Sequence, residues 1–155
     1  MVLVIRNSIF GALDDGSGNY FVKQIEFPEV FDGAAIIDIK ASGICGSDLH
    51  MTNERIEPQT IPSGHEIAGE IIELPKSYTG NLAIGDRVAI DNIGAGKSCS
   101  NCYYCNYGQF RHCVNPSPET GGGFSQFITR KPSGLFKISD QMDWNDGALV
   151  CLLYT

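Results

Sequence analysis

Four cysteines close together in the chain constrain its fold more than any other feature of the sequence. They follow the spacing Cys99-x2-Cys102-x2-Cys105-x7-Cys113. The two short gaps let one tight loop present three thiolates, and the longer gap brings the fourth thiolate to the far side of a metal ion. A closed site of four thiolates is typical of structural zinc, which stabilises a loop with little core of its own. We therefore predict a zinc-binding lobe over residues 94–115.

Two other uses of clustered cysteines agree less well with the sequence. Disulfides form in oxidising compartments, and the first ten residues, interrupted by Arg6 and Asn7, lack the order of a signal peptide. No apolar run reaches the ~18 residues that a membrane helix requires. An iron–sulfur cluster also binds four cysteines, but ferredoxin-like spacings differ from this one. We expect a cytoplasmic protein with reduced thiols and no membrane partner.

The charge balance narrows the range of partners further. The chain has 155 residues, of which 43% are hydrophobic, and a net charge of −7. A nucleic-acid partner is not expected, because binding phosphates requires clustered lysines and arginines. The nearest basic cluster, Arg130 with Lys131, is interpreted as solvated surface.

The apolar and β-branched runs predict a mainly β domain. Eighteen glycines are consistent with many tight turns between short strands, as in a barrel or a sandwich. One helix is expected near the C-terminus, over residues 144–153, with Asp143 as its N-cap. The expected strands cover residues 35–41, 67–74, 86–93, 124–130 and 135–138.

A second metal site is left open by the residues alone. Cys45 and His65 are the candidates, but no local pair has the spacing of metal ligands. A cysteine after an apolar strand is also an ordinary small core residue, and a histidine beside glycine is also an ordinary satisfied polar group. His112, next to Cys113, is interpreted as a surface residue of the lobe.

Five motifs in one order point to a family. They are Gly43-x-Cys45-x-Ser47-Asp48-x-His50, then Gly64-His65-Glu66 with Gly69, then Gly85-Asp86-Arg87-Val88, then the four-cysteine lobe, and then Gly122-Gly123-Phe124-Ser125-Gln126-Phe127 followed by Leu135-Phe136-Lys137-Ile138. In order and approximate spacing, from about residue 35 onward, they resemble the medium-chain, zinc-dependent alcohol dehydrogenases. The resemblance implies a GroES-like, partly open β-barrel over residues 1–155, with the lobe and a C-terminal helix.

The resemblance also implies a catalytic zinc with three protein ligands and one free position. Carried over, the ligands are Cys45, His65 and Cys151, so that the chain would bind two Zn²⁺ ions. The alternative for Cys151 is a buried helix residue. In such a site the metal polarises the oxygen of an alcohol, and a nicotinamide cofactor accepts the hydride. Many polyol-type members carry Glu-Pro where this chain has Cys151-Leu152, which weakens a sorbitol-like assignment and favours an alcohol or aldehyde as the small-molecule partner.

Four further residues receive roles from the same resemblance. Ser47 resembles the first hydroxyl of a proton relay, and His50 resembles its outer residue. Asp48 would hold the far nitrogen of His65, and Glu66 would lie close to the metal. The alternatives are a turn-forming serine, an exposed histidine and two surface carboxylates.

The nucleotide-binding half of such an enzyme is not expected within these residues. No Gly-rich loop stands between a strand and a helix, so a Rossmann domain for NAD or NADP is absent from the sequence as read. We expect an excised or truncated catalytic domain rather than a stand-alone protein, inactive by itself. The resemblance implies a homo-oligomer for the full-length form. The competing interpretation is a zinc-binding structural or interaction module without catalysis, and one metal per chain instead of two would favour it.

Overall fold

The computed structural model describes residues 7–54, 57–92 and 94–150. Its centre is a five-stranded antiparallel sheet with the order β6-β3-β4-β5-β7. The strands are β3 (Ala35–Gly43), β4 (Glu66–Glu73), β5 (Arg87–Asp91), β6 (Phe127–Arg130) and β7 (Leu135–Lys137). The edge strands β6 and β7 do not pair with each other, so the expected mainly β, partly open architecture is confirmed.

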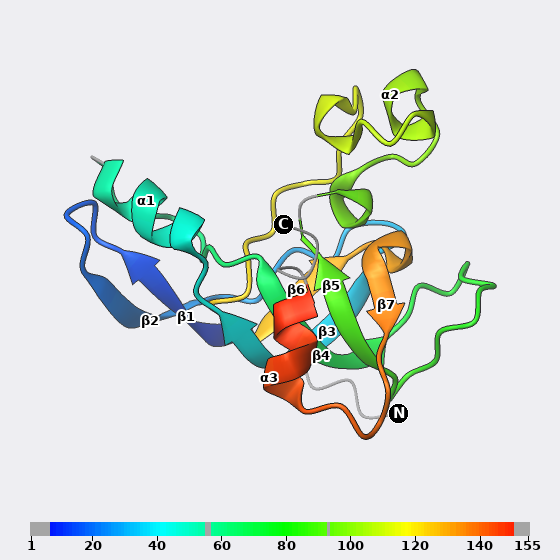
Figure 1. Cartoon of the computed structure of the whole chain (residues 1–155), viewed down its shortest axis with the longest axis horizontal. Coiled ribbons are helices and arrows are strands. Elements are labelled where there is room, and N and C mark those ends of the chain that lie inside the picture. Colours follow the sequence, from blue (N-terminus) through cyan, green and yellow to red (C-terminus); the bar gives the residue numbers. More distant parts are fainter. Residues whose placement is uncertain (1–6, 55–56, 93, 151–155) are drawn as a thin grey trace.

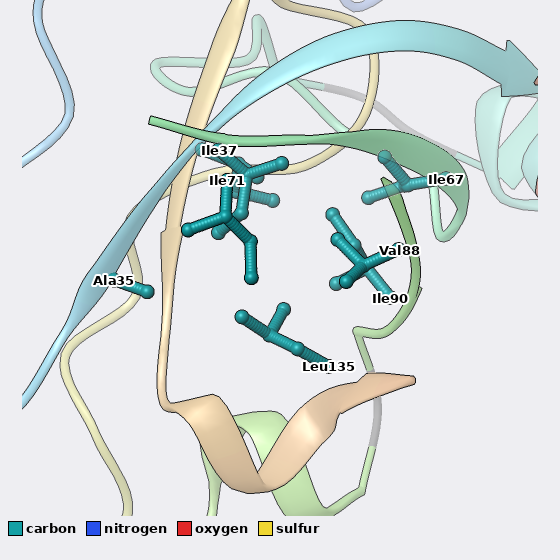
Figure 2. Packing of buried hydrophobic residues seen from close by; sticks show 8 residues of the cluster. Ala35, Ile37, Ile67, Ile71, Val88, Ile90 and Leu135 are labelled. Atoms are coloured by element: carbon teal, nitrogen blue, oxygen red, sulfur yellow. The ribbon is translucent and has the colours of Figure 1, made fainter. Parts of the chain in front are cut away.

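One face of this sheet forms the main core. Side chains two residues apart on a strand point to the same face, and they meet those of the neighbouring strands (Figure 2). This cluster comprises Ala35, Ile37, Ile67, Ile71, Val88, Ile90, Ile128 and Leu135. Because each of the five strands contributes to it, the core supports the ends of β3 and β4, beside which Cys45 and His65 lie.

The other face is covered by a short C-terminal helix, α3 (Trp144–Ala148) (Figure 1). Its N-cap is Asp143, whose carboxylate accepts the N–H of Asn145 at 2.8 Å, as the sequence predicted. Arg87 of β5 fixes the approach to this helix, because its guanidinium donates to the Met142 carbonyl at 2.6 Å and stacks 3.8 Å above the Trp144 ring. The expected end of the helix, 151–153, lies outside the described residues.

A two-stranded hairpin was not predicted from the sequence. It consists of β1 (Ser8–Asp14) and β2 (Tyr20–Glu26), and Figure 1 places it beside the helix α1 (Gly46–Glu54). Backbone bonds from Ala12 N to Phe124 O (2.7 Å) and from Gln126 N to Phe10 O (3.2 Å) attach the hairpin to the segment before β6. The strand β2 has no alternation of apolar and polar residues that would reveal it, because nearly all of its residues are exposed.

The lobe projects from the sheet between β5 and β6 (Figure 1). Short helical turns build it: η1 (Ala95–Lys97), α2 (Tyr103–Asn106) and η2 (Phe110–His112), with η3 (Pro132–Gly134) after β6. Within the described ranges, no helix is long and apolar enough to cross a bilayer.

Candidate metal centres

The four lobe cysteines converge on one point. Their sulfur atoms all lie within 4.8 Å of one another. Sγ of Cys105 is 3.4 Å from Sγ of Cys102 and 3.9 Å from Sγ of Cys99. Four thiolates about 2.3 Å from a tetrahedral zinc are about 3.8 Å apart, so these distances match a shared ion and exceed an S–S bond. The donor set therefore fits the predicted structural zinc.

Backbone N–H groups aimed at the sulfur atoms favour the form that binds metal. Bonds from the N–H groups of Cys105 and Val114 lower the pKa of Cys102 to about 6. Burial works in the opposite direction and raises the pKa of Cys105. At Cys113 the N–H of Cys99, 3.2 Å from the sulfur, helps to outweigh burial, and the pKa is lowered. A thiolate, not a thiol, is the metal ligand.

A second group of ligand types lies where β3 ends and β4 begins. One ligand atom each of Cys45, His65 and Glu66 lies within 4.8 Å of the other two. Antiparallel pairing explains the approach, because Gly43 is directly opposite Glu66 in the ladder. Cys45 follows β3 by two residues and His65 precedes β4 by one, so the two side chains meet at one end of the strand pair.

The imidazole of His65 is held between two groups from α1. Oδ1 of Asp48 is 3.6 Å from Nδ1, and Oγ of Ser47 is 3.5 Å from Nε2. Oδ2 of the same aspartate accepts the N–H of Cys45 at 2.9 Å, so one buried carboxylate contacts both candidate ligands. With Nδ1 facing Asp48, Nε2 is the nitrogen left for a metal.

Glu66 supplies the strongest sign that this centre is built for a cation. Its side chain is 1% exposed, and Oε1 has no hydrogen-bond partner among the described residues. The carboxylate packs against the backbone of Gly43, where a Cβ would overlap Oε2. A buried carboxylate is costly unless it is paired or binds a metal. Glu66 therefore qualifies as a ligand itself, whereas the sequence analysis placed it only near the metal.

Not all predicted site residues can be placed beside this centre. Cys151, the expected third ligand, lies outside the described residues. His50 is exposed on α1, one turn beyond Ser47, and is not among the residues that line the cleft described below. Its role in a relay therefore stays a prediction.

The interpretation of Arg130 as solvated surface was wrong. Arg130 is 1% exposed, and burial lowers the pKa of its guanidinium to about 10. It donates to Oδ1 of Asn92 (2.6 Å), to Oγ1 of Thr120 (2.7 Å) and to the Gly121 carbonyl. Asn92 in turn donates to the carbonyl of Gly64 at 2.9 Å, the residue before His65.

This buried network also supports the segment before β4 that carries His65. Gly64 has φ +94°, and its carbonyl accepts two bonds, from Asn92 and from the N–H of Gly123. A Cβ at Gly64 would lie 2.8 Å from Cδ1 of Phe124. Sequence reasoning missed the network because a single arginine at the end of a strand carries no sign of burial.

A cleft of about 540 Å³ opens beside the second centre. Ser47, Asp48 and His65 line it at the end near the metal ligands. Thr60 and Ser63, from the segment before β4, continue its walls. Lys97 and Arg111 come from the lobe, and Asn92 and Glu119 lie on either side of the lobe in the sequence. A small molecule in this cleft would contact polar side chains along most of its length.

Comparison with protein families decides the identity of the fold. The model of the alcohol dehydrogenase GroES-like domain matches residues 32–140. The chain belongs to the alcohol dehydrogenase family. The GroES-like fold expected from the sequence is thereby confirmed. The zinc-dependent family is supported as well, because a zinc-type alcohol dehydrogenase-like protein of Haemophilus influenzae is 30% identical over 80% of this chain and 37% of its own length.

Three alcohol dehydrogenase relatives illustrate the similarity. Sorbitol dehydrogenase of Bacillus subtilis is 32% identical over 138 residues, which are 83% of this chain and 38% of that protein. Galactitol-1-phosphate dehydrogenase of Escherichia coli has a TM-score of 0.73 and 27% identity over 90% of this chain and 41% of its own. An alcohol dehydrogenase of E. coli CFT073, solved with NADH, has a TM-score of 0.72 and 25% identity over 92% of this chain and 42% of its own. The chain thus spans about two fifths of the length of these relatives.

Proposed function

We propose that the chain is the zinc-binding catalytic domain of an NAD(P)-dependent alcohol or polyol dehydrogenase, with two Zn²⁺ ions per chain. The observation that carries this proposal is the convergence of Cys45, His65 and the buried, unpartnered Glu66 beside a cleft. A lobe that served only as a structural module would need no such second centre. The relatives that bind NADH or act on sorbitol and galactitol 1-phosphate support the reaction class.

The residues present suit the chemistry that this function requires. When bound, zinc would polarise the oxygen of an alcohol, and a nicotinamide held by another domain would accept the hydride. Asp48 would keep Nε2 of His65 aimed at the metal through its contact with Nδ1. Ser47 has its hydroxyl beside Nε2, where it would take up the proton of the substrate hydroxyl and pass it on. His50, on the exposed surface of the same helix, would return it to solvent.

The third protein ligand remains a choice between two residues of the chain. Cys151 is the candidate from the resemblance, and Glu66 is the candidate from its burial and its unpartnered oxygen. X-ray absorption of the zinc-loaded chain distinguishes them, since the lobe contributes only sulfur. A Cys151→Ala variant that keeps both zinc ions favours Glu66.

Metal stoichiometry tests the proposal as a whole. Mass spectrometry under native conditions should find two zinc ions in the wild-type chain and one in Cys45→Ser. Cys102→Ser is the matched control, and it should lose only the ion of the lobe. One zinc in the wild-type chain, unaffected by Cys45→Ser, would contradict the proposal and favour the structural or interaction module.

The remaining parts of the function concern what lies beyond these residues. Because the chain covers 38% of the sorbitol dehydrogenase, we place the nucleotide-binding half outside it. The residues 1–155 alone should therefore not reduce NAD or NADP in the presence of an alcohol. The absorbance of the reduced nicotinamide, NADH or NADPH, measures this. A small-molecule alcohol or aldehyde as partner, assembly into homo-oligomers and a cytoplasmic location belong to the same proposal.

A further inference from the structure

The part of the cleft wall that the lobe supplies carries an unusual charge for this protein. The chain as a whole has a net charge of −7, yet the lobe side of the cleft is lined by Lys97 and Arg111 against a single carboxylate, Glu119. The end near the metal ligands has the opposite character, with the buried carboxylate of Asp48. A molecule in the cleft would therefore meet different charges at the lobe wall and beside the metal ligands.

The carboxylate of Glu119 is already used within the protein. Its Oε2 is 2.6 Å from Nζ of Lys97, and its Oε1 accepts the N–H of Gly121 at 3.1 Å. The charges of Lys97 and Glu119 therefore balance each other. Glu119 is therefore not available to neutralise a second cation on the same wall.

Arg111 is that second cation. It stands in η2, exposed at the lobe side of the cleft, and within 7–54, 57–92 and 94–150 no carboxylate pairs with its guanidinium. The buried Arg130 lies behind the same wall, where it donates to the Gly121 carbonyl, and adds to the positive potential. A planar guanidinium binds carboxylates and phosphates through two parallel hydrogen bonds.

We propose that the cleft selects a polyol with an anionic group, a carboxylate or a phosphate, and that Arg111 binds this group while a hydroxyl of the same molecule reaches Ser47. The inference rests on the proposed function and names its substrate class. The cleft volume of about 540 Å³ accommodates a six-carbon chain. Polar side chains such as Thr60, Ser63 and Asn92 along the walls suit the remaining hydroxyls.

Three probes with the same carbon chain test the proposal: sorbitol, gluconate and sorbitol 6-phosphate. Each is titrated into the ¹⁵N-labelled, zinc-loaded chain, and binding is followed by NMR shifts of the cleft amides. At least one anionic probe should bind about tenfold tighter than sorbitol or more, the range of a charge-assisted pair. Gluconate and sorbitol 6-phosphate distinguish a carboxylate from a phosphate as the preferred group.

Two variants assign the preference to a residue. Arg111→Gln should remove it and leave the affinity for sorbitol unchanged, while Arg111→Lys should retain part of it. Lys76→Gln removes one positive charge from an exposed position away from the cleft, so it should retain the full preference. Raising the salt concentration should weaken the preference because exposed charges are screened.

The outcomes separate this inference from the proposed function. Zinc content is measured on the same samples. Two zinc ions with no preference for either anionic probe, or a preference that survives Arg111→Gln, overturns the inference alone. The latter result would indicate an anion bound directly at the metal. Only one zinc ion, in the lobe, overturns the proposed function.

Discussion

Replacing Asp48 by asparagine tests how the second centre is held together. Asp48 is 2% exposed, its Oδ2 is 2.9 Å from the N–H of Cys45, and its Oδ1 is 3.6 Å from Nδ1 of His65. Asparagine has the same shape but no charge. If its oxygen keeps the bond to Cys45, its NH₂ group faces Nδ1 of His65, and the histidine loses the negative oxygen 3.6 Å from that nitrogen.

The size of the effect follows from these two contacts. A neutral acceptor in place of a charged one weakens the bond to the Cys45 N–H by about 1 kcal/mol. The lost carboxylate opposite His65 adds about 1 kcal/mol more. The sum, about 2 kcal/mol, corresponds to roughly 30-fold weaker zinc binding, inside the 10- to 100-fold range typical of groups that orient metal-binding histidines.

Competition with a chromophoric chelator measures this affinity. The wild-type chain should release its zinc in two phases, and Asp48→Asn should shift only the phase of the second centre. The lobe serves as the internal reference, since its four ligands do not contact Asp48. Asp38→Asn is the matched control, because that carboxylate is half-exposed on β3 and pairs with Lys40 at 2.8 Å. Unchanged zinc affinity in Asp48→Asn would refute the reasoning.

Three further predictions concern stability. Arg130→Met should lower the free energy of unfolding by about 3–5 kcal/mol in urea, because it leaves buried acceptors unpaired. Gly64→Ala should cost about 1–2 kcal/mol for its backbone conformation alone, with more from the contact with Phe124, and should also lower the zinc content below that of the wild type. The hydroxyl and N–H of Ser17 lower the pKa of Asp15 from 3.8 to about 2, so the stability this adds is present above pH 3.8 and is lost as the pH falls toward 2. Asp15→Asn should remove that acid-dependent part in unfolding curves recorded across this range.

The sequence predicted the sheet well where strands are buried. The expected strands 67–74 and 86–93 correspond to β4 and β5, and they were predictable because their apolar side chains indicate burial directly. The hairpin β1–β2 and the helix α1 were missed for the opposite reason. β2 is almost entirely exposed, and α1 is short and polar, so neither shows a period that sequence reasoning can detect.

The candidate site also has a part that could be predicted from the sequence and a part that could not. The lobe cysteines were predictable from local spacing, because the geometry of a tetrahedral ion is encoded in the gaps between them. Bringing Cys45 and His65 together required the resemblance, since antiparallel pairing of β3 with β4 creates their proximity. The burial of Glu66 and of Arg130 was beyond reach, because nothing in their neighbours distinguishes them from surface charges.

The two centres also differ in how much of the chain must be folded before an ion can bind. The lobe cysteines belong to one continuous stretch, so a largely unfolded polypeptide can already gather them around zinc. Cys45, His65 and Glu66 meet only after β3 and β4 have paired in the sheet. We therefore expect metallation in a fixed order during maturation, with an intermediate that holds one ion and has no reactive centre.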